Sequence, residues 1–373
     1  MAKNSVSIPE QQNNIFGALL GIILVVLLAV FAHWLKLQVY NIKNVAGLGI
    51  PGSVLEYPIW AVILGLILNP ILKRLNIYHF LKPGFRTELF LKVGLVLLGA
   101  GINIVFIAKA GMGGILQGII MVTSVFFFSR WLSGKFGLPD KLRAVMSTAI
   151  AVCGVSAAIA AAGAVLAKKE EITYITTLVI IVALPLMVLS PILASAMNLP
   201  EPVAGAWFGG NVDTTAAVVG AGTIYGKVAQ EVATIVKSSQ NALIGVVAFL
   251  LSLYFSTVVS GGKAERPSLM IIWQRFPKFV LGFILASIFL SIGLIPAAAA
   301  AGKDPNVGNV ITWVKDWAFC IAFVCMGLDV SFGELKKMGW NPFIVYIIVT
   351  IFNTILALIV AWLIFGVLFP YGK

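Results

Sequence analysis

Charged residues are scarce in this sequence. Only 11% of its 373 residues are Asp, Glu, Lys or Arg, whereas 60% are hydrophobic. Water-soluble globular domains carry about 25% charged residues. The shortage of charge excludes a soluble domain of this length. It predicts an all-α polytopic membrane protein, because long apolar runs cross a bilayer as helices.

Cysteine and histidine are also rare, and their positions exclude several kinds of site. Cys153, Cys320 and Cys325 all lie in apolar stretches, which argues against a disulfide framework and offers no metal-ligand spacing. His33 and His79 have no partner motif. The sequence also lacks a nucleotide-binding loop and a protease-like arrangement of catalytic side chains. We therefore predict no enzyme activity, no metal centre and no cofactor other than a coupling Na⁺.

Apolar stretches of membrane-spanning length recur along the whole chain, with connections too short for a soluble domain. The pattern predicts about eleven transmembrane helices. The predicted spans are residues 15–35, 54–72, 88–108, 113–133, 142–167, 172–197, 202–225, 229–258, 270–295, 311–332 and 342–368.

Basic residues dominate the short loops and account for the formal net charge of +12. Such loops face anionic lipid headgroups, so we expect membrane lipids and no nucleic acid as partners. The basic loops share one side if the N-terminus is cytoplasmic and the C-terminus lies outside a bacterial inner membrane. Lys168–Glu171 is then the one charged outer loop. The basic loop residues are Lys73, Arg74, Lys82, Arg86, Arg130, Lys135, Lys141, Arg143, Lys263, Arg266, Arg275, Lys278, Lys336 and Lys337.

Residues 147–163 form an apolar stretch of small side chains. Cys153, Gly154, Val155 and Ser156 lie near its middle, where glycine weakens a helix and serine can bond the freed backbone. A helix broken inside a membrane is tolerated only around a cavity or against protein, and such breaks form transporter substrate sites. The alternative is an unbroken helix that packs tightly through its small residues.

A shorter stretch, Val324–Ser331, partly repeats this pattern around Gly327 and includes Asp329. The two stretches lie five spans apart, so a duplication would be inverted. We predict two inverted five-helix repeats whose broken helices cross. A second alignment, of Gly99–Gly111 with Gly327–Gly339, would pair other spans. Asp329 is a candidate coupling residue, with an interfacial cap as the alternative. The predicted parts are 1–49 (tail and extra first helix), 50–198 (first repeat) and 199–373 (second repeat).

A second break is predicted after the glycines at 209 and 210. Asn211 ends this glycine segment, and Asp213 follows at membrane depth. A carboxylate at the bilayer centre costs about 3 kcal/mol on insertion scales, so it normally faces a cavity or a partner. Together with Thr214 and Thr215, Asp213 would suit Na⁺ or a proton. The alternative is that Asn211 or Asp213 only caps a helix.

Five consecutive polar residues, Lys237–Asn241, interrupt the span at 229–258. They cannot all face lipid, so Lys237 and Ser238 are candidate substrate contacts. Lys237 is expected to pair with Asp213 or to attract an anion. The alternative is an interfacial segment in which the lysine snorkels to the headgroups.

These stretches together resemble the YeiH-like sulfate exporter family of bacterial membrane proteins. The resemblance rests on the segments around Cys153–Ser156, Gly205–Gly222, Ile235–Lys237 and Met326–Leu328, and covers essentially the whole chain. It implies relatedness to bile-acid-symporter and sodium/proton-antiporter types, with two inverted five-helix repeats and crossed, broken helices. The chain departs from this family at three positions: Asp213 replaces His, Ala217 replaces Gln, and Gln240 replaces Arg.

The function expected from these observations is secondary active transport of a small ion or a small anion, sulfate-like by resemblance and coupled to Na⁺ or H⁺. A cation/proton antiporter that uses Asp213 is the alternative, and a membrane-embedded enzyme ranks below both. The expected partners are the transported solute and lipids, with a homodimer as an option.

Overall fold

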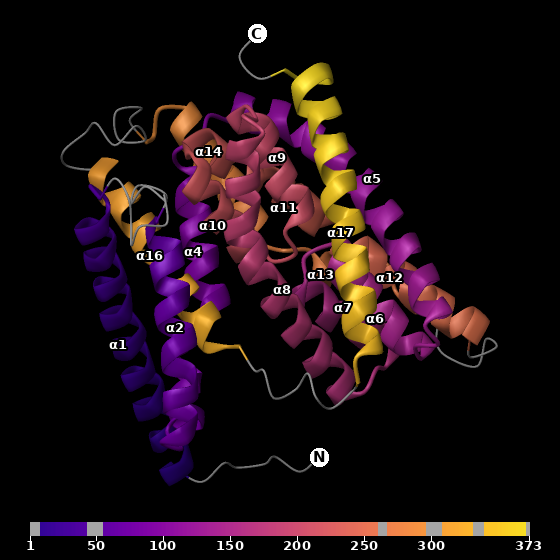
Figure 1. Ribbon diagram of the computed structural model, residues 1–373, viewed down its shortest axis with the longest axis horizontal. Coiled ribbons are helices and arrows are strands. Elements are labelled where there is room, and N and C mark those ends of the chain that lie inside the picture. Colours follow the sequence, from indigo (N-terminus) through magenta and orange to yellow (C-terminus); the bar gives the residue numbers. More distant parts are fainter. Residues whose placement is uncertain (1–7, 43–54, 260–266, 296–307, 331–338, 371–373) are drawn as a thin grey trace. The chain divides into compact units, whose positions relative to one another are not determined.

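The computed structural model describes residues 8–42, 55–259, 267–295, 308–330 and 339–370. Every regular element in these segments is a helix (Figure 1). This agrees with the predicted all-α class and with the need of membrane-buried backbone to satisfy its own hydrogen bonds. The chain forms two compact units, one from residues 1–97 and 298–330 and the other from residues 98–297 and 331–373. These units do not follow the predicted repeat boundaries, so the inverted repeat stays a prediction.

The first unit is built around a close crossing of two helices. An added Cβ on Gly65 would lie 2.4 Å from the carbonyl oxygen of Val324, and one on Gly327 would lie 2.4 Å from that of Val62. Two glycines therefore let the backbones of α2 and α16 touch, as small residues do between membrane helices. The unit contains α1 (Ile8–Val39), α2 (Tyr57–Arg74), α3 (Tyr78–Leu81), η2 (Lys82–Gly84), most of α4 (Thr87–Gly99), and α16 (Gly308–Leu328).

The second unit contains the remaining helices, several of which are too short to cross a membrane. Long helices lie around two pairs of short helices, α6 with α7 and α9 with α10 (Figure 1). Its elements are α5 (Ile104–Lys135), α6 (Asp140–Ala151), α7 (Val155–Val165), α8 (Lys169–Ala196), α9 (Glu201–Asn211), α10 (Thr215–Tyr225), α11 (Lys227–Ala242), α12 (Ile244–Tyr254), η3 (Phe255–Val259), α13 (Met270–Arg275), α14 (Phe279–Ser291), α17 (Asn341–Ala361) and η5 (Trp362–Leu368).

Six helical segments of the described chain are long and apolar enough to cross a membrane, judged by length and composition. The count of eleven crossings is therefore not confirmed. The six segments are Ile15–Val39, Ile104–Lys135, Lys169–Ala196, Lys227–Val259, Val310–Leu328 and Asn341–Leu368.

The predicted span at 142–167 is a hairpin of two half-helices. The helices α6 and α7 have 12 and 11 residues and are separated by Val152–Gly154. They pack against each other, and Lys141 Nζ at the start of α6 donates to the carbonyl oxygen of Leu166, just after α7, at 2.8 Å. A half-helix of this length covers roughly 17 Å, against a hydrocarbon core of about 30 Å. The interpretation of this segment as one crossing is wrong, because the chain returns to its starting end. We call it the first hairpin, with its tip at Val152–Gly154.

The predicted span at 202–225 also folds back. The helices α9 and α10 have 11 residues each and are separated by Val212–Thr214. Glu201, at the start of α9, accepts hydrogen bonds from the backbone N–H groups of Val228 at 2.8 Å and Ala229 at 3.2 Å, just after the end of α10. This is the second hairpin, with its tip at Val212–Thr214.

The 28-residue helix α8 connects the two hairpins and places their bases at its opposite ends. In Figure 1, α6 and α7 lie toward the lower end of the second unit and α9 toward its upper end. The two tips meet between these ends. A Cβ added to Gly154 would lie 3.3 Å from Cγ2 of Thr214 and 3.5 Å from the carbonyl oxygen of Asp213. Two half-crossing hairpins thus approach each other from opposite ends of one long helix.

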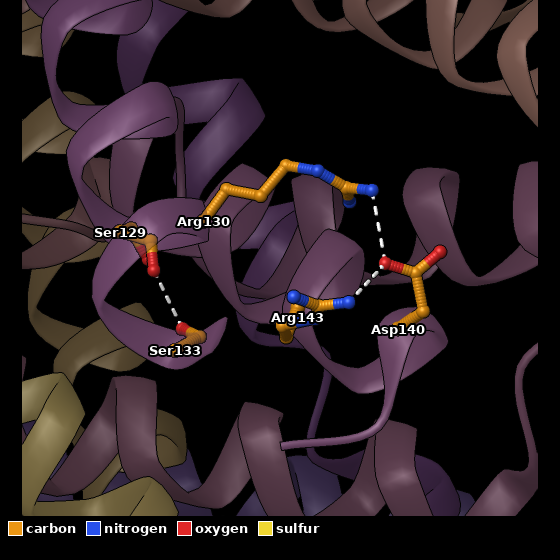
Figure 2. Close-up of polar contacts among 5 residues, drawn as sticks. All are labelled: Ser129, Arg130, Ser133, Asp140 and Arg143. Carbon is orange, nitrogen blue, oxygen red and sulfur yellow. Dashed lines mark hydrogen bonds and ion pairs between the residues drawn. The ribbon is translucent and has the colours of Figure 1, made fainter. Parts of the chain in front are cut away.

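The base of the first hairpin is held to α5 by polar contacts (Figure 2). Asp140, the first residue of α6, accepts from Arg130 Nη2 at 2.9 Å and from Arg143 Nη2 at 2.7 Å through the same oxygen, Oδ1. Beside them, the Ser133 hydroxyl donates to the carbonyl oxygen of Ser129 at 2.6 Å. The α5–α6 turn is therefore fixed by one carboxylate between two guanidinium groups.

Candidate functional site

The tip of the first hairpin depends on a glycine. Gly154 has a φ of +69°, in the region that favours glycine, and an added Cβ would lie 2.5 Å from Cγ1 of Val179. The predicted break near Gly154 is confirmed, and the unbroken small-residue helix is excluded. Of its neighbours, Cys153 is buried, Val155 is half-buried and Ser156 is exposed.

Two side chains of α11 bind the exposed backbone at this tip. Lys237 Nζ donates to the carbonyl oxygen of Val152 at 2.8 Å and to Oε1 of Gln240 at 3.1 Å. Gln240 Nε2 donates to the carbonyl oxygen of Ala151 at 2.8 Å. The last carbonyls of a helix lack intrahelical partners, and cations are favourable there. The ammonium of Lys237 therefore caps α6, and its 1% exposure excludes the snorkelling alternative.

The tip of the second hairpin is capped by a residue other than those predicted. Thr214 Oγ1 accepts from the backbone N–H of Ala217 at 3.2 Å, which makes Thr214 the N-cap of α10. Asn211 closes α9, and its Oδ1 accepts from the Thr354 hydroxyl at 2.7 Å. Its carbonyl oxygen accepts from Asn353 Nδ2 at 2.9 Å. Neither Asn211 nor Asp213 is the cap, and α17 holds Asn211 in place.

Asp213 is 1% exposed and only partly satisfied. Its Oδ2 accepts from the Tyr346 hydroxyl at 2.5 Å, while its Oδ1 has no hydrogen-bond partner. Lys237 lies close enough for the two charges to interact, as predicted, but no ion pair within 4 Å joins these two described residues. A buried carboxylate with an open oxygen can accept a proton or coordinate a cation.

The remaining predicted residues of this region flank Asp213. Thr215 Oγ1 accepts from Asn241 Nδ2 at 3.0 Å, at the start of α10. Ser238 is buried, and its hydroxyl has no hydrogen-bond partner. The structure therefore gathers Asp213, Thr214, Thr215 and the polar residues of α11 around the two hairpin tips.

Gly327 and Asp329 belong to the first unit, where they lie at the end of α16. The helix α16 ends at Leu328, one residue after Gly327, so the chain leaves the helix close to the predicted break, and Gly327 itself serves the close crossing with α2. Asn69 and Tyr78 donate to the carbonyl oxygen of Leu328. Oδ2 of Asp329 accepts from the Thr87 hydroxyl at 2.9 Å. Ser331 lies outside the described residues.

Sequence reasoning missed the contribution of α17. Tyr346, Asn353 and Thr354 all reach the second tip from this helix. Their spacings of seven and eight residues place them on one helical face. Polar residues at that period within the apolar stretch 342–368 were the available signal. Gln240 was noted only as a departure from a family pattern, and its hydrogen bond to Ala151 gives it a structural role.

Comparison with known proteins shows what the chain is similar to. A family model described as "Conserved hypothetical protein 698" matches residues 20–346. A UPF0324 membrane protein of Rhodopirellula baltica is 36% identical over 355 residues, covering 92% of this chain and 62% of the relative. One from Nitratidesulfovibrio vulgaris is 25% identical over 356 residues, covering 92% of this chain and 94% of the relative. One from Bacillus cereus is 26% identical over 356 residues, covering 94% and 93%.

The chain spans little more than half the length of some of these relatives, since it covers 62% of the Rhodopirellula protein and 55% of a second Nitratidesulfovibrio protein that is 35% identical. The descriptions of these relatives name a membrane location and no substrate. No solved structure matches the chain.

Proposed function

Since the chain belongs to the conserved hypothetical protein 698 family of UPF0324 membrane proteins, we propose that it is a secondary active transporter. Its solute is a small inorganic or organic anion, sulfate-like by the resemblance noted above, and its transport is coupled to Na⁺ or H⁺. Two hairpins that enter from opposite ends support this proposal. Broken helices that meet at the middle of a membrane are the usual construction of a transporter site.

The observation that carries the proposal is the environment of Asp213. A buried carboxylate with an oxygen that lacks a partner costs stability, commonly about 1–3 kcal/mol for an unsatisfied polar group and more for a charge. The second hairpin nevertheless keeps Oδ1 buried without a partner, on a residue whose backbone lies where the two tips meet. A group kept in this state is suited to reversible uptake of Na⁺ or H⁺, which is the requirement for coupling.

The anion is assigned to the beginnings of α7 and α10. Both half-helices start at the hairpin tips, with Val155 and Thr215 as their first residues. The N-terminal end of a helix carries partial positive charge and free N–H groups, which together favour anions. Ser156 adds a hydroxyl beside the first of these ends. Lys237 contributes indirectly, because its ammonium is engaged by the backbone of the first tip.

The alternative function is cation/proton antiport through Asp213. It is favoured by the same carboxylate and by the engagement of Lys237 elsewhere, which leaves a negative charge at the meeting point of the tips. An enzyme ranks lower, because the Lys237 ammonium at the tips donates to the carbonyl oxygen of Val152 and to Gln240 and is therefore engaged by structural partners.

The hairpins also bear on the proposed orientation of the chain in the membrane. With α6 and α7 folded back, Lys168 and Lys169 follow a hairpin that returns to the side of Lys135 and Lys141. The loop Lys168–Glu171, the one charged loop that the eleven-span prediction placed outside, then lies on the same side as the basic loops. This supports a cytoplasmic N-terminus and an external C-terminus. Lys263, Arg266, Lys336 and Lys337, which belong to the same argument, lie outside the described residues.

Flux in proteoliposomes tests the proposal. Purified protein is reconstituted with sulfate, sulfite, taurine or small carboxylates inside, and labelled solute uptake is followed under Na⁺ or pH gradients, with protein-free liposomes as the control. The proposal expects saturable counterflow that one of the two gradients accelerates. Exchange of Na⁺ for H⁺ without any solute would establish the antiporter alternative. Conversion of a solute without flux would overturn transport in favour of an enzyme.

A further inference from the structure

One side of α11 carries buried oxygen atoms without hydrogen-bond partners. The hydroxyl oxygens of Thr234 and Ser238 and the side-chain carbonyl oxygen of Asn241 share this property. Their residues are only 0%, 4% and 2% exposed. Spacings of four and three residues place the three side chains on one side of the helix, across two turns. Three such atoms in one line require an explanation, because buried polar atoms are almost always hydrogen-bonded to protein or to water.

The same side of α11 faces α10. Gln230 Nε2 donates to Oγ1 of Thr223 at 2.6 Å, near the base of the second hairpin. Asn241 Nδ2 donates to Oγ1 of Thr215 at 3.0 Å, near its tip. The two helices therefore run antiparallel, and the polar side chains form a line between them. The line begins beside Thr215, two residues from Asp213, and ends at the half-buried Thr223.

The two helices pack closely near the base of the second hairpin. A Cβ added to Gly222 would lie 2.5 Å from Cα of Gln230, so the backbones touch near the base of the hairpin. Helices packed this closely leave no room between them for a hydrated cation or an oxyanion. Single water molecules need only a small polar space and two to four hydrogen-bond partners. The unpartnered hydroxyl and carbonyl oxygens along the line supply such partners.

We propose that the α10–α11 interface holds a single-file line of water molecules that carries protons between Asp213 and the base of the second hairpin. Thr234, Ser238 and Asn241 bind these waters, and Thr223 with Gln230 forms the mouth. A proton that enters at the mouth passes along the waters to the open oxygen of Asp213, and the reverse path releases it. The inference rests on the proposed function, in which Asp213 couples transport, and it assigns H⁺ as the coupling ion.

Several ionisable groups surround the two ends of this line. Tyr346 from α17 and Lys237 from α11 face Asp213, with Cys153 of the first tip beside Lys237. Glu201 from α9 and the exposed Lys227 lie near the mouth. Between the ends, residues 234, 238 and 241 contribute hydroxyl and amide groups, and the buried carboxylate of Glu231 precedes Thr234 by three residues on the same side of α11.

Cysteine accessibility tests the water line independently of transport. Thr234→Cys and Ser238→Cys are compared with Val236→Cys, a matched control at the same depth whose side chain packs against Gly209. Each purified variant in nanodiscs is exposed to a small methanethiosulfonate reagent, and peptide mapping separates the new thiol from the native cysteines. The proposal expects the two line positions to react about tenfold faster than the control, because only hydrated thiols ionise and react readily. Equal rates at all three positions would overturn it.

A second pair of variants links the line to proton movement. Thr234→Val removes the hydroxyl while keeping the side-chain volume, and Thr234→Ser keeps the hydroxyl. The line predicts that Thr234→Val slows proton-driven flux about tenfold with unchanged solute KM, and that Thr234→Ser restores it. Full flux in Thr234→Val would overturn the proton route while leaving transport itself established. Absence of any flux in the unaltered protein would instead contradict the proposed function.

Discussion

The tips of the two hairpins satisfy their polar groups in opposite ways. At the first tip, Lys237 and Gln240 donate to the two carbonyl groups that end α6. At the second tip, the hydroxyl of Tyr346 reaches one oxygen of Asp213 and the other oxygen has no partner. Both tips lie in the same buried region, so burial alone does not explain the difference. The comparison indicates that α11 anchors the backbone of the first tip, whereas the second tip holds a carboxylate with one open oxygen.

The largest difference between the two tips is expected in the loss of stability when Gly154 is substituted. Replacing it with alanine would force a φ of +69° on a residue with a Cβ and press that atom against Val179. Backbone strain and overpacking each cost about 1–3 kcal/mol, so Gly154→Ala is expected to lose several kcal/mol of stability. Thermal unfolding in detergent, followed by size-exclusion chromatography, measures the loss.

Gly137 provides the matched control for this substitution. It has the same φ of +69°, but an added Cβ would meet nothing within 4 Å. Gly137→Ala therefore carries the strain without the clash, and should be the milder change. Equal losses of stability in the two variants would contradict a packed first tip.

The next largest effect is expected at Lys237. Lys237→Met keeps an apolar stem of similar length and removes the donor to Val152. An unsatisfied buried carbonyl costs about 1–3 kcal/mol, which should appear as a lower unfolding temperature. Lys227→Met, at an exposed position of the same helix, is the control and should leave the unfolding temperature unchanged. Unaltered stability in Lys237→Met would contradict a structural role for the ammonium and would favour a role in solute binding.

Unlike the substitutions at Gly154 and Lys237, a substitution at Asp213 should change stability little and ion coupling strongly. Asp213→Asn keeps the shape and removes a buried charge, so the free energy of unfolding is expected to change by less than about 1 kcal/mol. Flux should lose its dependence on Na⁺ and pH gradients. Asp329→Asn, in the first unit, is the control and should keep that dependence. If the two variants exchange these outcomes, the coupling site lies at Asp329.

The effect expected at Tyr346 is confined to ion affinity. Tyr346→Phe removes the single hydroxyl that donates to Asp213 and leaves the ring in place. One hydrogen bond to a charged group is worth about 1.5–3 kcal/mol, so the ion concentration that gives half-maximal flux should change by roughly tenfold or more. Maximal flux at saturating ion should change little. An unchanged half-maximal concentration would mean that the hydroxyl does not tune the carboxylate.

The sequence predicted both hairpin tips as breaks but not the folding back of the chain. Glycine and small polar residues at 153–156 and 209–214 mark weak points in any helix. An apolar stretch of about 25 residues fits one crossing as well as two half-crossings. The contact that decides between them joins Lys141 to Leu166 across the whole segment. Such a tertiary contact has no local signal.

The glycines at 154 and 327 show why a local pattern was ambiguous. Both follow a cysteine closely in small-residue stretches, yet one adopts a positive φ at a break and the other lies in the last turn of a helix. The partner of Gly327 is Gly65, far away in the sequence. Glycine permits either a break or a close helix crossing, and the neighbouring helix decides which one forms. The predicted burial of Lys237 is confirmed. It could be predicted because five consecutive polar residues in one apolar run cannot all face lipid.

The central claim is that two hairpins enter from opposite sides and meet at Asp213. Single cysteines at four exposed positions, introduced as Lys135→Cys, Lys168→Cys, Met197→Cys and Lys227→Cys, test it with a membrane-impermeant thiol reagent on sealed vesicles; the native cysteines are buried. The account predicts that Lys135→Cys and Lys168→Cys are labelled from one side, and that Met197→Cys and Lys227→Cys are labelled from the other. Labelling of Lys135→Cys and Lys168→Cys from opposite sides would show that residues 142–167 cross the membrane, and would contradict the account.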